Sequence, residues 1–215
     1  MSTWFHGSAT DSLTHGLAPQ RLYASESREL AATDEFAGSG GYVFEIELVD
    51  TADIFDPDVV ASAAEFKTMR KFLASLPSDK YRAAVTHAAS TFFEVAIGGE
   101  PPKSGILSIP MNEELSEECE DDWERVADSI REGEFVGQTR DFWTLFSHVL
   151  GSVVSEGGYW SYADLELGLA MDDAVELAGF DGHYETEDER SVRNIAIYRP
   201  DKTARVVGYT TTRGK

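Results

Sequence analysis

The stretch YVFEIELV, residues 42–49, has period-two alternation, with Glu45 and Glu47 on one side of the repeat. This pattern is typical of a strand with one face in a protein core and the other in water. The preceding run GSGG, residues 38–41, favours a turn, because glycine adopts backbone conformations that other residues avoid. We therefore predict a strand that begins directly after this turn and exposes its two glutamates.

The chain before this strand carries two more short apolar stretches. Residues 3–8 end in His6-Gly7-Ser8, and residues 22–24 lead into SESRELAA, residues 25–32. Serines ahead of acidic residues are typical of a helix N-cap. The pattern predicts a strand, a short helical turn near Leu13 to Leu17, a second strand, and then a capped helix.

The end of the chain has a similar character. Residues 165–178 have an amphipathic helical pattern, the run GFDG at 179–182 favours a turn, and residues 183–185 are expected to be extended. Two further strands are predicted at residues 195–198 and 205–209. Strands thus lie near both ends of the chain.

The middle of the chain, residues 57–164, is predicted to be helical. Pro57 fits a first helical turn after Asp56 as the cap, and apolar residues recur every three to four positions. We expect an α+β protein in which residues 1–56 and 165–215 form one small sheet domain and residues 57–164 form a helical insertion.

Composition indicates a folded protein that works in the cytoplasm. The chain has 215 residues, of which 42% are hydrophobic, enough to bury a sizeable core. The single cysteine, Cys119, excludes an internal disulfide and a cysteine-based zinc site. We expect neither a secretion signal nor a membrane-spanning helix, because no apolar run is long enough.

The formal net charge of −21 bears on the partners of this protein. Such a field repels phosphate backbones, so direct nucleic-acid binding is not expected. The acidity can serve solubility alone, or the acidic face can mimic nucleic acid or dock on a basic protein, including one that itself binds nucleic acid. The sequence leaves both interpretations open.

The segment Phe5 to Ser8 contains the first candidate binding residues. Gly7 permits close approach of a ligand to the backbone, while His6 and Ser8 offer polar groups. Tyr23 ends a predicted strand, where its ring can stack on an aromatic or cationic group. Each of these residues alone is equally compatible with a structural role in a sheet.

The order of these motifs resembles the ADP-ribosyltransferase fold. Phe5 to Ser8, then residues 22–25 leading into a helix, then residues 42–46 resemble the front half of its branch with a histidine, a tyrosine and an acidic residue. Residues 178–182 and 194–201 are similar to its closing strands, including those of phage-encoded and anti-CRISPR members. The resemblance implies a small split antiparallel β-sheet with a helical insertion.

The resemblance also implies that NAD is the substrate. His6 would hold the NAD ribose, the backbone at Gly7 would meet the nicotinamide amide, and Tyr23 would stack on its ring. The hydroxyl of Ser8 adds a further polar group at this site. Ser25 would supply a supporting hydroxyl. No metal site is expected, and the sequence contains no P-loop or Rossmann glycine motif.

The catalytic carboxylate is harder to assign. Many members of the family have a glutamate where this chain has Asn194, and asparagine cannot act as a base. By the resemblance to small phage-encoded members, Asp188 is the first candidate, with Glu187 and Glu189 as reserves. The alternative is that this acidic run is simply a solvated loop.

The sequence therefore predicts a mono-ADP-ribosyltransferase that modifies a macromolecule, in our expectation a protein, as a phage or mobile-element factor acting on host defence. One alternative is an NAD glycohydrolase, in which water accepts the ADP-ribose. The other is an acidic binding module without catalytic activity.

Overall fold

The computed structural model describes residues 3–18, 20–33, 36–63, 69–95, 172–184 and 192–212. The chain divides into two units, Met1–Phe55 with Phe180–Lys215, and Asp56–Gly179. The elements of the first unit are β1 (Thr3–Ser8), the 3-10 helix η1 (Ser12–His15), β2 (Leu22–Ser25), α1 (Arg28–Ala31), β3 (Tyr42–Leu48), β4 (Ile54–Phe55), β5 (Gly182–Tyr184), β6 (Asn194–Ile197), α8 (Pro200–Thr203) and β7 (Ala204–Thr211). The second unit contains α2 (Pro57–Ala63), α3 (Met69–Ser75), α4 (Asp79–Val95) and a helical segment at residues 172–177.

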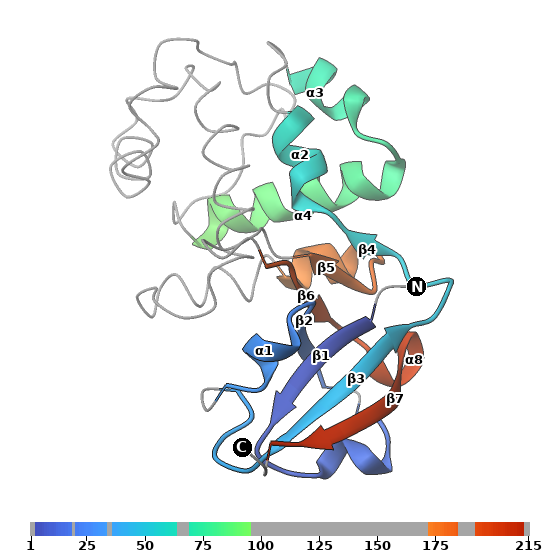
Figure 1. Ribbon diagram of the computed structural model, residues 1–215. Coiled ribbons are helices and arrows are strands. Elements are labelled where there is room, and N and C mark those ends of the chain that lie inside the picture. Colours follow the sequence, from blue (N-terminus) through green and yellow to red (C-terminus); the bar gives the residue numbers. More distant parts are fainter. Residues whose placement is uncertain are drawn as a thin grey trace, which may run out of the picture. The chain divides into compact units, whose positions relative to one another are not determined.

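The strands of the first unit form one open sheet in the order β4-β5-β6-β2-β1-β3-β7. β1 lies between β2 and β3, and it pairs with β3 from Thr3 opposite Glu47 to Ser8 opposite Tyr42. β3 in turn pairs with β7, so that β1, β3 and β7 run side by side (Figure 1). The strand predicted at residues 42–49 is confirmed as β3.

The sheet is mixed, so the prediction of a purely antiparallel sheet is wrong at one edge. β4 pairs with β5 in parallel, with Ile54 opposite Gly182 and Phe55 opposite His183. Parallel neighbours need a long connection, because the chain must return to its starting end before it pairs again. Residues 56–179, the entire second unit, supply that connection. The coarser prediction of a protein that mixes helices and strands is confirmed.

One face of the sheet holds the hydrophobic core. The alternate residues of β3, Phe44 and Ile46, are buried there, and the η1 region adds Leu13 and Leu17. The other buried members are Trp4, Leu22, Ala24, Ile195 and Ile197. Because side chains in a strand alternate between faces, the period-two pattern of the sequence already selects these residues.

α1 packs on the opposite face of the sheet. Its N-cap is Ser27, whose Oγ accepts a hydrogen bond from Leu30 N at 3.2 Å. Arg28 joins the helix to two strands, because it donates to Thr210 Oγ1 at 2.8 Å and lies 3.8 Å from Glu45 Oε1. The predicted capped helix after residue 25 is confirmed.

The second unit begins as the sequence predicts. Asp58 N donates to Asp56 Oδ1 at 3.1 Å, so Asp56 caps α2 directly before Pro57. The hydroxyl of Tyr81 on α4 accepts a hydrogen bond from Asp56 N at 2.9 Å and ties the start of α2 to α4. Residues 96–164 of the predicted insertion lie outside the described residues.

A buried histidine, His183, lies on β5, the second strand from one edge of the sheet. His183 Nδ1 is 2.7 Å from the hydroxyl of Tyr198, and the guanidinium of Arg21 lies 5.1 Å from the Tyr198 ring centroid. Burial, and then the positive charge of Arg21, lower the pKa of His183 to about 3. The histidine is therefore neutral in the folded protein at neutral pH.

We expect this histidine to make the fold sensitive to mild acid. In the unfolded chain His183 takes up a proton below about pH 6.5, whereas the folded protein resists protonation down to about pH 3. The free energy of unfolding should therefore fall as pH drops from 6.5 towards 3, by up to about 1.4 kcal/mol per pH unit from this residue.

Urea unfolding at pH 7.5, 6.5, 5.5 and 5.0 tests this expectation. The His183→Gln variant should lose part of the pH slope, while His15→Gln, at an exposed histidine, should keep the slope of the unmodified chain. Equal slopes for the unmodified chain and His183→Gln would contradict the assignment.

Candidate functional site

Two neighbouring strands, β1 and β2, diverge near the centre of the sheet. β1 and β2 have a single registered pair, Phe5 opposite Ser25, although β1 is fully paired with β3 and β2 with β6. We call the divergent edge between β1 and β2, lined by His6, Gly7 and Tyr23 beside that pair, the seam. Backbone polar groups along the seam lack a regular ladder, so side chains or a ligand can satisfy them.

The side chain of His6 bridges β1 and β2 at the seam. Its Nδ1 lies 2.6 Å from the carbonyl oxygen of Tyr23. A carbonyl oxygen can only accept, so Nδ1 carries the proton of this hydrogen bond, and Nε2 of a neutral ring is an acceptor. Burial lowers the pKa of His6, and the hydrogen bond to Tyr23 opposes that shift without cancelling it. At neutral pH the ring is therefore a fixed, uncharged acceptor.

The side chains of His6 and Tyr23 leave the sheet on opposite faces. His6 is paired with Phe44, whose ring belongs to the core, whereas Tyr23 shares its face with Ser25 and Phe5. The seam is therefore where the two residues meet, through the imidazole and the carbonyl rather than through their rings. A ligand that contacts both must span the seam.

Two half-exposed aromatic rings lie on the α1 side of the seam. Tyr23 is 48% exposed, and so is Phe36, which follows α1. A Cβ atom added at Gly7 would overlap the carbonyl oxygen of Ala31 and lie 2.8 Å from Phe36 Cβ. Phe36 is thus held next to Gly7. Phe36 lies in a loop, so no periodic pattern of the sequence could identify it.

The two serines have structural hydrogen bonds. Ser25 is buried, and its Oγ accepts from Ser27 N at 3.1 Å in the turn before α1. Ser8 Oγ accepts from Thr10 N at 3.2 Å where the chain turns out of β1. Ser25 lies at the end of the seam where β1 and β2 are paired, which we call the closed end. Ser8 lies three residues past the Phe5–Ser25 pair, where the strands have diverged.

The predicted catalytic acids Glu187, Asp188 and Glu189 lie outside the described residues. The strand that follows them begins at Asn194, directly opposite Ser25. Two hydrogen bonds between Glu26 and Arg193 join the chain after β2 to the chain before β6. Glu26 N donates to Arg193 O and Arg193 N donates to Glu26 Oε1, both at 3.0 Å. The start of β6 therefore lies next to the Ser25 end of β2, where β1 and β2 are paired.

Glu45 is a carboxylate that sequence reasoning did not select. It is paired with Phe5, so it lies on the same face as Tyr23. Its side chain is one-third exposed and faces the guanidinium of Arg28 at 3.8 Å. The alternating pattern of residues 42–49 indicated a solvent-facing glutamate, but only the register places it on the Tyr23 face of the sheet, opposite Phe5 and one strand away from the seam.

Neither of two grooves in this unit coincides with the seam. One, of about 640 Å³, lies between η1 and β7, and the other, of about 270 Å³, lies beside Trp4 and Tyr184. Within the described ranges, no cluster of histidine, cysteine and acidic residues has the geometry to hold a metal ion. Nor is any described helix both long enough and apolar enough to cross a bilayer.

Comparisons of this chain with protein families, with characterised proteins and with solved structures give no match.

The close packing at Gly7 leads to a stability prediction. Gly7→Ala forces the new methyl group into the backbone of Ala31, so the free energy of unfolding should fall by about 1–3 kcal/mol. Gly208→Ala on β7 is the matched control, because its Cβ would meet only the flexible carboxylate of Glu45, at 3.1 Å. Urea unfolding of both variants measures the difference; equal midpoints would argue against tight packing of α1 on β1.

Proposed function

We propose that the seam binds NAD and that the protein transfers the ADP-ribose group to a protein acceptor. The observation that carries this proposal is the neutral His6 ring, held by the carbonyl of Tyr23 at the divergence of β1 and β2, beside two half-exposed aromatic rings. The resemblance of Phe5 to Ser8 and of residues 22–25 to the ADP-ribosyltransferase fold supports the same assignment.

The aromatic side of the seam suits the nicotinamide ring. Tyr23 and Phe36 offer flat faces on which a planar, electron-poor ring stacks. Backbone groups at Gly7 can form hydrogen bonds with the carboxamide, which has both a donor and an acceptor. The buried hydroxyl of Ser25 lies within the same part of the sheet.

The imidazole side suits a ribose. Nε2 of neutral His6 accepts a hydrogen bond from a ribose hydroxyl, while Nδ1 keeps its bond to Tyr23. This second bond fixes the tautomer and the ring orientation, so the acceptor is in place before NAD arrives. Protonation of the ring would replace the acceptor with a donor.

The reaction requires a carboxylate near the ribose carbon that reacts. The bond from C1′ to the nicotinamide nitrogen breaks, the electron pair leaves with neutral nicotinamide, and positive charge develops on the ribose. The acceptor then forms a bond to C1′ and gives its proton to the carboxylate. Asp188 is our first candidate, with Glu187 and Glu189 as reserves.

Chain connectivity supports this choice. Asp188 is four residues from Val192, a length of chain that spans no more than about 14 Å. Val192 precedes Arg193, which forms two hydrogen bonds with Glu26 at the closed end of the seam. Glu45 is a further candidate, because it lies on the Tyr23 face of the sheet, on β3, one strand away from the seam across β1.

One observation favours an inactive binding module as a second candidate. Asn194 lies opposite Ser25, in the position where the family commonly has its glutamate. If none of the neighbouring acids takes over that role, NAD would bind without being cleaved. An NAD glycohydrolase differs from the transferase only in the acceptor, which is then water.

We expect NAD binding to depend on both sides of the seam. His6→Ala and Tyr23→Ala should each raise the dissociation constant for NAD about tenfold or more, whereas Leu177→Ala, at an exposed apolar residue of the second unit, should not change it. For the unmodified chain, affinity should fall as the pH drops below 6.5, because the pKa of His6 is lowered from its usual value of 6.5 and protonation removes the acceptor at Nε2.

Calorimetric titration with NAD measures these constants. Absence of NAD binding by the unmodified chain, or unchanged binding by both seam variants, would overturn the assignment of the seam.

We expect a different result for the catalytic acid. Asp188→Asn should lower the rate of nicotinamide release at least about a hundredfold while NAD affinity stays within about threefold, because a general base acts on the chemical step. Glu187→Gln, Glu189→Gln and Glu45→Gln are matched variants. Incubation with labelled NAD and cell lysate separates the functions: a labelled protein indicates transfer, free ADP-ribose indicates hydrolysis, and intact NAD indicates a binding module.

A further inference from the structure

A side-chain contact joins the two ends of the connection between β5 and β6. Tyr184 is the last residue of β5, and Arg193 directly precedes β6. The guanidinium carbon of Arg193 lies 4.2 Å from the centre of the Tyr184 ring, within the range of a cation–π interaction. Because the register pairs Tyr184 with Ile195, Arg193 is a diagonal neighbour of Tyr184 and can reach its ring. The connection therefore begins and ends at one contact.

The ring of Tyr184 also contacts β1. Its centre lies 5.8 Å from that of the Trp4 ring, and the two planes are inclined by 26°, so the rings are stacked. Trp4 is buried in the hydrophobic core, and close packing holds it in place. His6, the proposed acceptor for a ribose hydroxyl, lies two residues further along the same strand. The stacked rings thus link the end of β5 to the strand that carries His6.

The backbone of Arg193 is attached to the other strand of the seam. Its two hydrogen bonds with Glu26, the residue after β2, use the N and O atoms of Arg193. These bonds do not depend on the side chain, so the guanidinium makes a separate contact. We call the side chains of Trp4, Tyr184 and Arg193 the closed-end stack, because they lie beside the closed end of the seam.

The connection that begins and ends at the closed-end stack contains the acids proposed for catalysis. Asp188 is four residues from Tyr184 and five from Arg193. A chain attached at one end can place Asp188 anywhere within about 14 Å of that end, whereas attachment at both ends restricts it further. A misplacement of about 1 Å at a reacting group can lower a rate about a hundredfold. A contact at the base of the connection can therefore affect the chemical step.

We propose that Arg193 is a positioning residue for the transfer reaction. Its guanidinium, held against the ring of Tyr184, fixes the base of the connection and thereby the place of Asp188 relative to the ribose on His6. This inference rests on the proposed function, because it requires that the seam binds NAD and that an acid of this connection acts on it. In this role Arg193 does not touch NAD, so its side chain affects the reaction rate and not the affinity.

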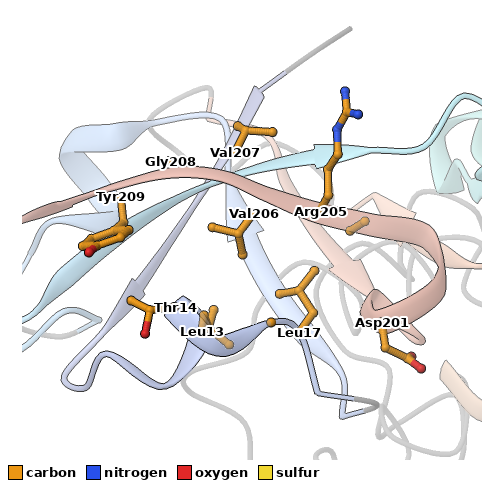
Figure 2. Close-up of a pocket in the computed structure, with 11 residues that line it drawn as sticks. Leu13, Thr14, Leu17, Asp201, Arg205, Val206, Val207, Gly208 and Tyr209 are labelled. Atoms are coloured by element: carbon orange, nitrogen blue, oxygen red, sulfur yellow. The ribbon is translucent and has the colours of Figure 1, made fainter.

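Arg193→Gln tests this role, because it removes the guanidinium and keeps both backbone hydrogen bonds. We expect nicotinamide release at saturating NAD to slow about tenfold or more, while the dissociation constant for NAD, measured by calorimetry, stays within about twofold. Arg193→Lys keeps a positive charge near the ring and should recover most of the rate. Arg205→Gln is the matched control and should keep the full rate. Arg205 lies on β7, is held by Glu47 at 2.7 Å, and points away from η1 (Figure 2).

Variants of Tyr184 test whether Arg193 acts through the ring. Tyr184→Phe keeps the ring and should keep the rate, whereas Tyr184→Leu should lower the rate as much as Arg193→Gln does. Adding Arg193→Gln to Tyr184→Leu should cause no further loss, because the contact is already absent. A further tenfold loss in the double variant would overturn the role of the ring.

The outcomes separate this inference from the proposed function. If the unmodified chain releases nicotinamide and Arg193→Gln releases it equally fast, the positioning role is wrong and the proposed function stands. If Arg193→Gln weakens NAD binding tenfold at an unchanged rate, Arg193 belongs to the binding site, which also overturns the inference. An unmodified chain that does not cleave NAD overturns the proposed transfer, and this inference with it.

Discussion

The sheet of the first unit depends on how β1 is paired. Its edge towards β3 forms six consecutive pairs, while its edge towards β2 forms one, at Phe5 and Ser25. A strand that is completely paired on one side is rigid, so the second side can diverge without loss of the fold. Divergence leaves polar backbone groups in the middle of the sheet, and the hydrogen bond from His6 to the carbonyl of Tyr23 satisfies one of them. The same bond fixes the imidazole in one tautomer.

The remaining structure around the seam follows from close backbone approach. α1 is only one turn long, and it reaches β1 because Gly7 has no side chain to keep the backbone of Ala31 away. Arg28 then joins α1 to Glu45 and Thr210 on neighbouring strands. The same packing holds Phe36, in the loop after α1, next to Gly7. The glycine of the His-Gly-Ser run is therefore required for packing, whether or not its backbone also meets a ligand.

Several elements were predictable because their signals are local. The alternation in residues 42–49, the serine before α1 and the Asp56-Pro57 start of α2 each depend on residues that are near in sequence. The parallel pairing of β4 with β5 was not predictable in this way, since Ile54 and Gly182 are brought together by the whole intervening chain. Of the predicted site residues, His6 and Tyr23 are joined by a hydrogen bond, Gly7 and Ser25 lie in the same region, and Ser8 has a structural turn contact. The roles of Glu187, Asp188 and Glu189 stay predictions.

The sequence by itself determined which residues face the core, where the strands at both ends of the chain lie, and how acidic the protein is. These properties follow from side-chain period and from charge, which need no knowledge of distant contacts. Only the tertiary structure decided that His6 reaches Tyr23 across a divergent pair of strands, that Phe36 lies next to Gly7, that Glu45 lies opposite Phe5, and that a bulge at Val207 turns Tyr209 towards η1. Each of these depends on register between strands far apart in the chain, and a shift of one residue would turn every side chain to the other face.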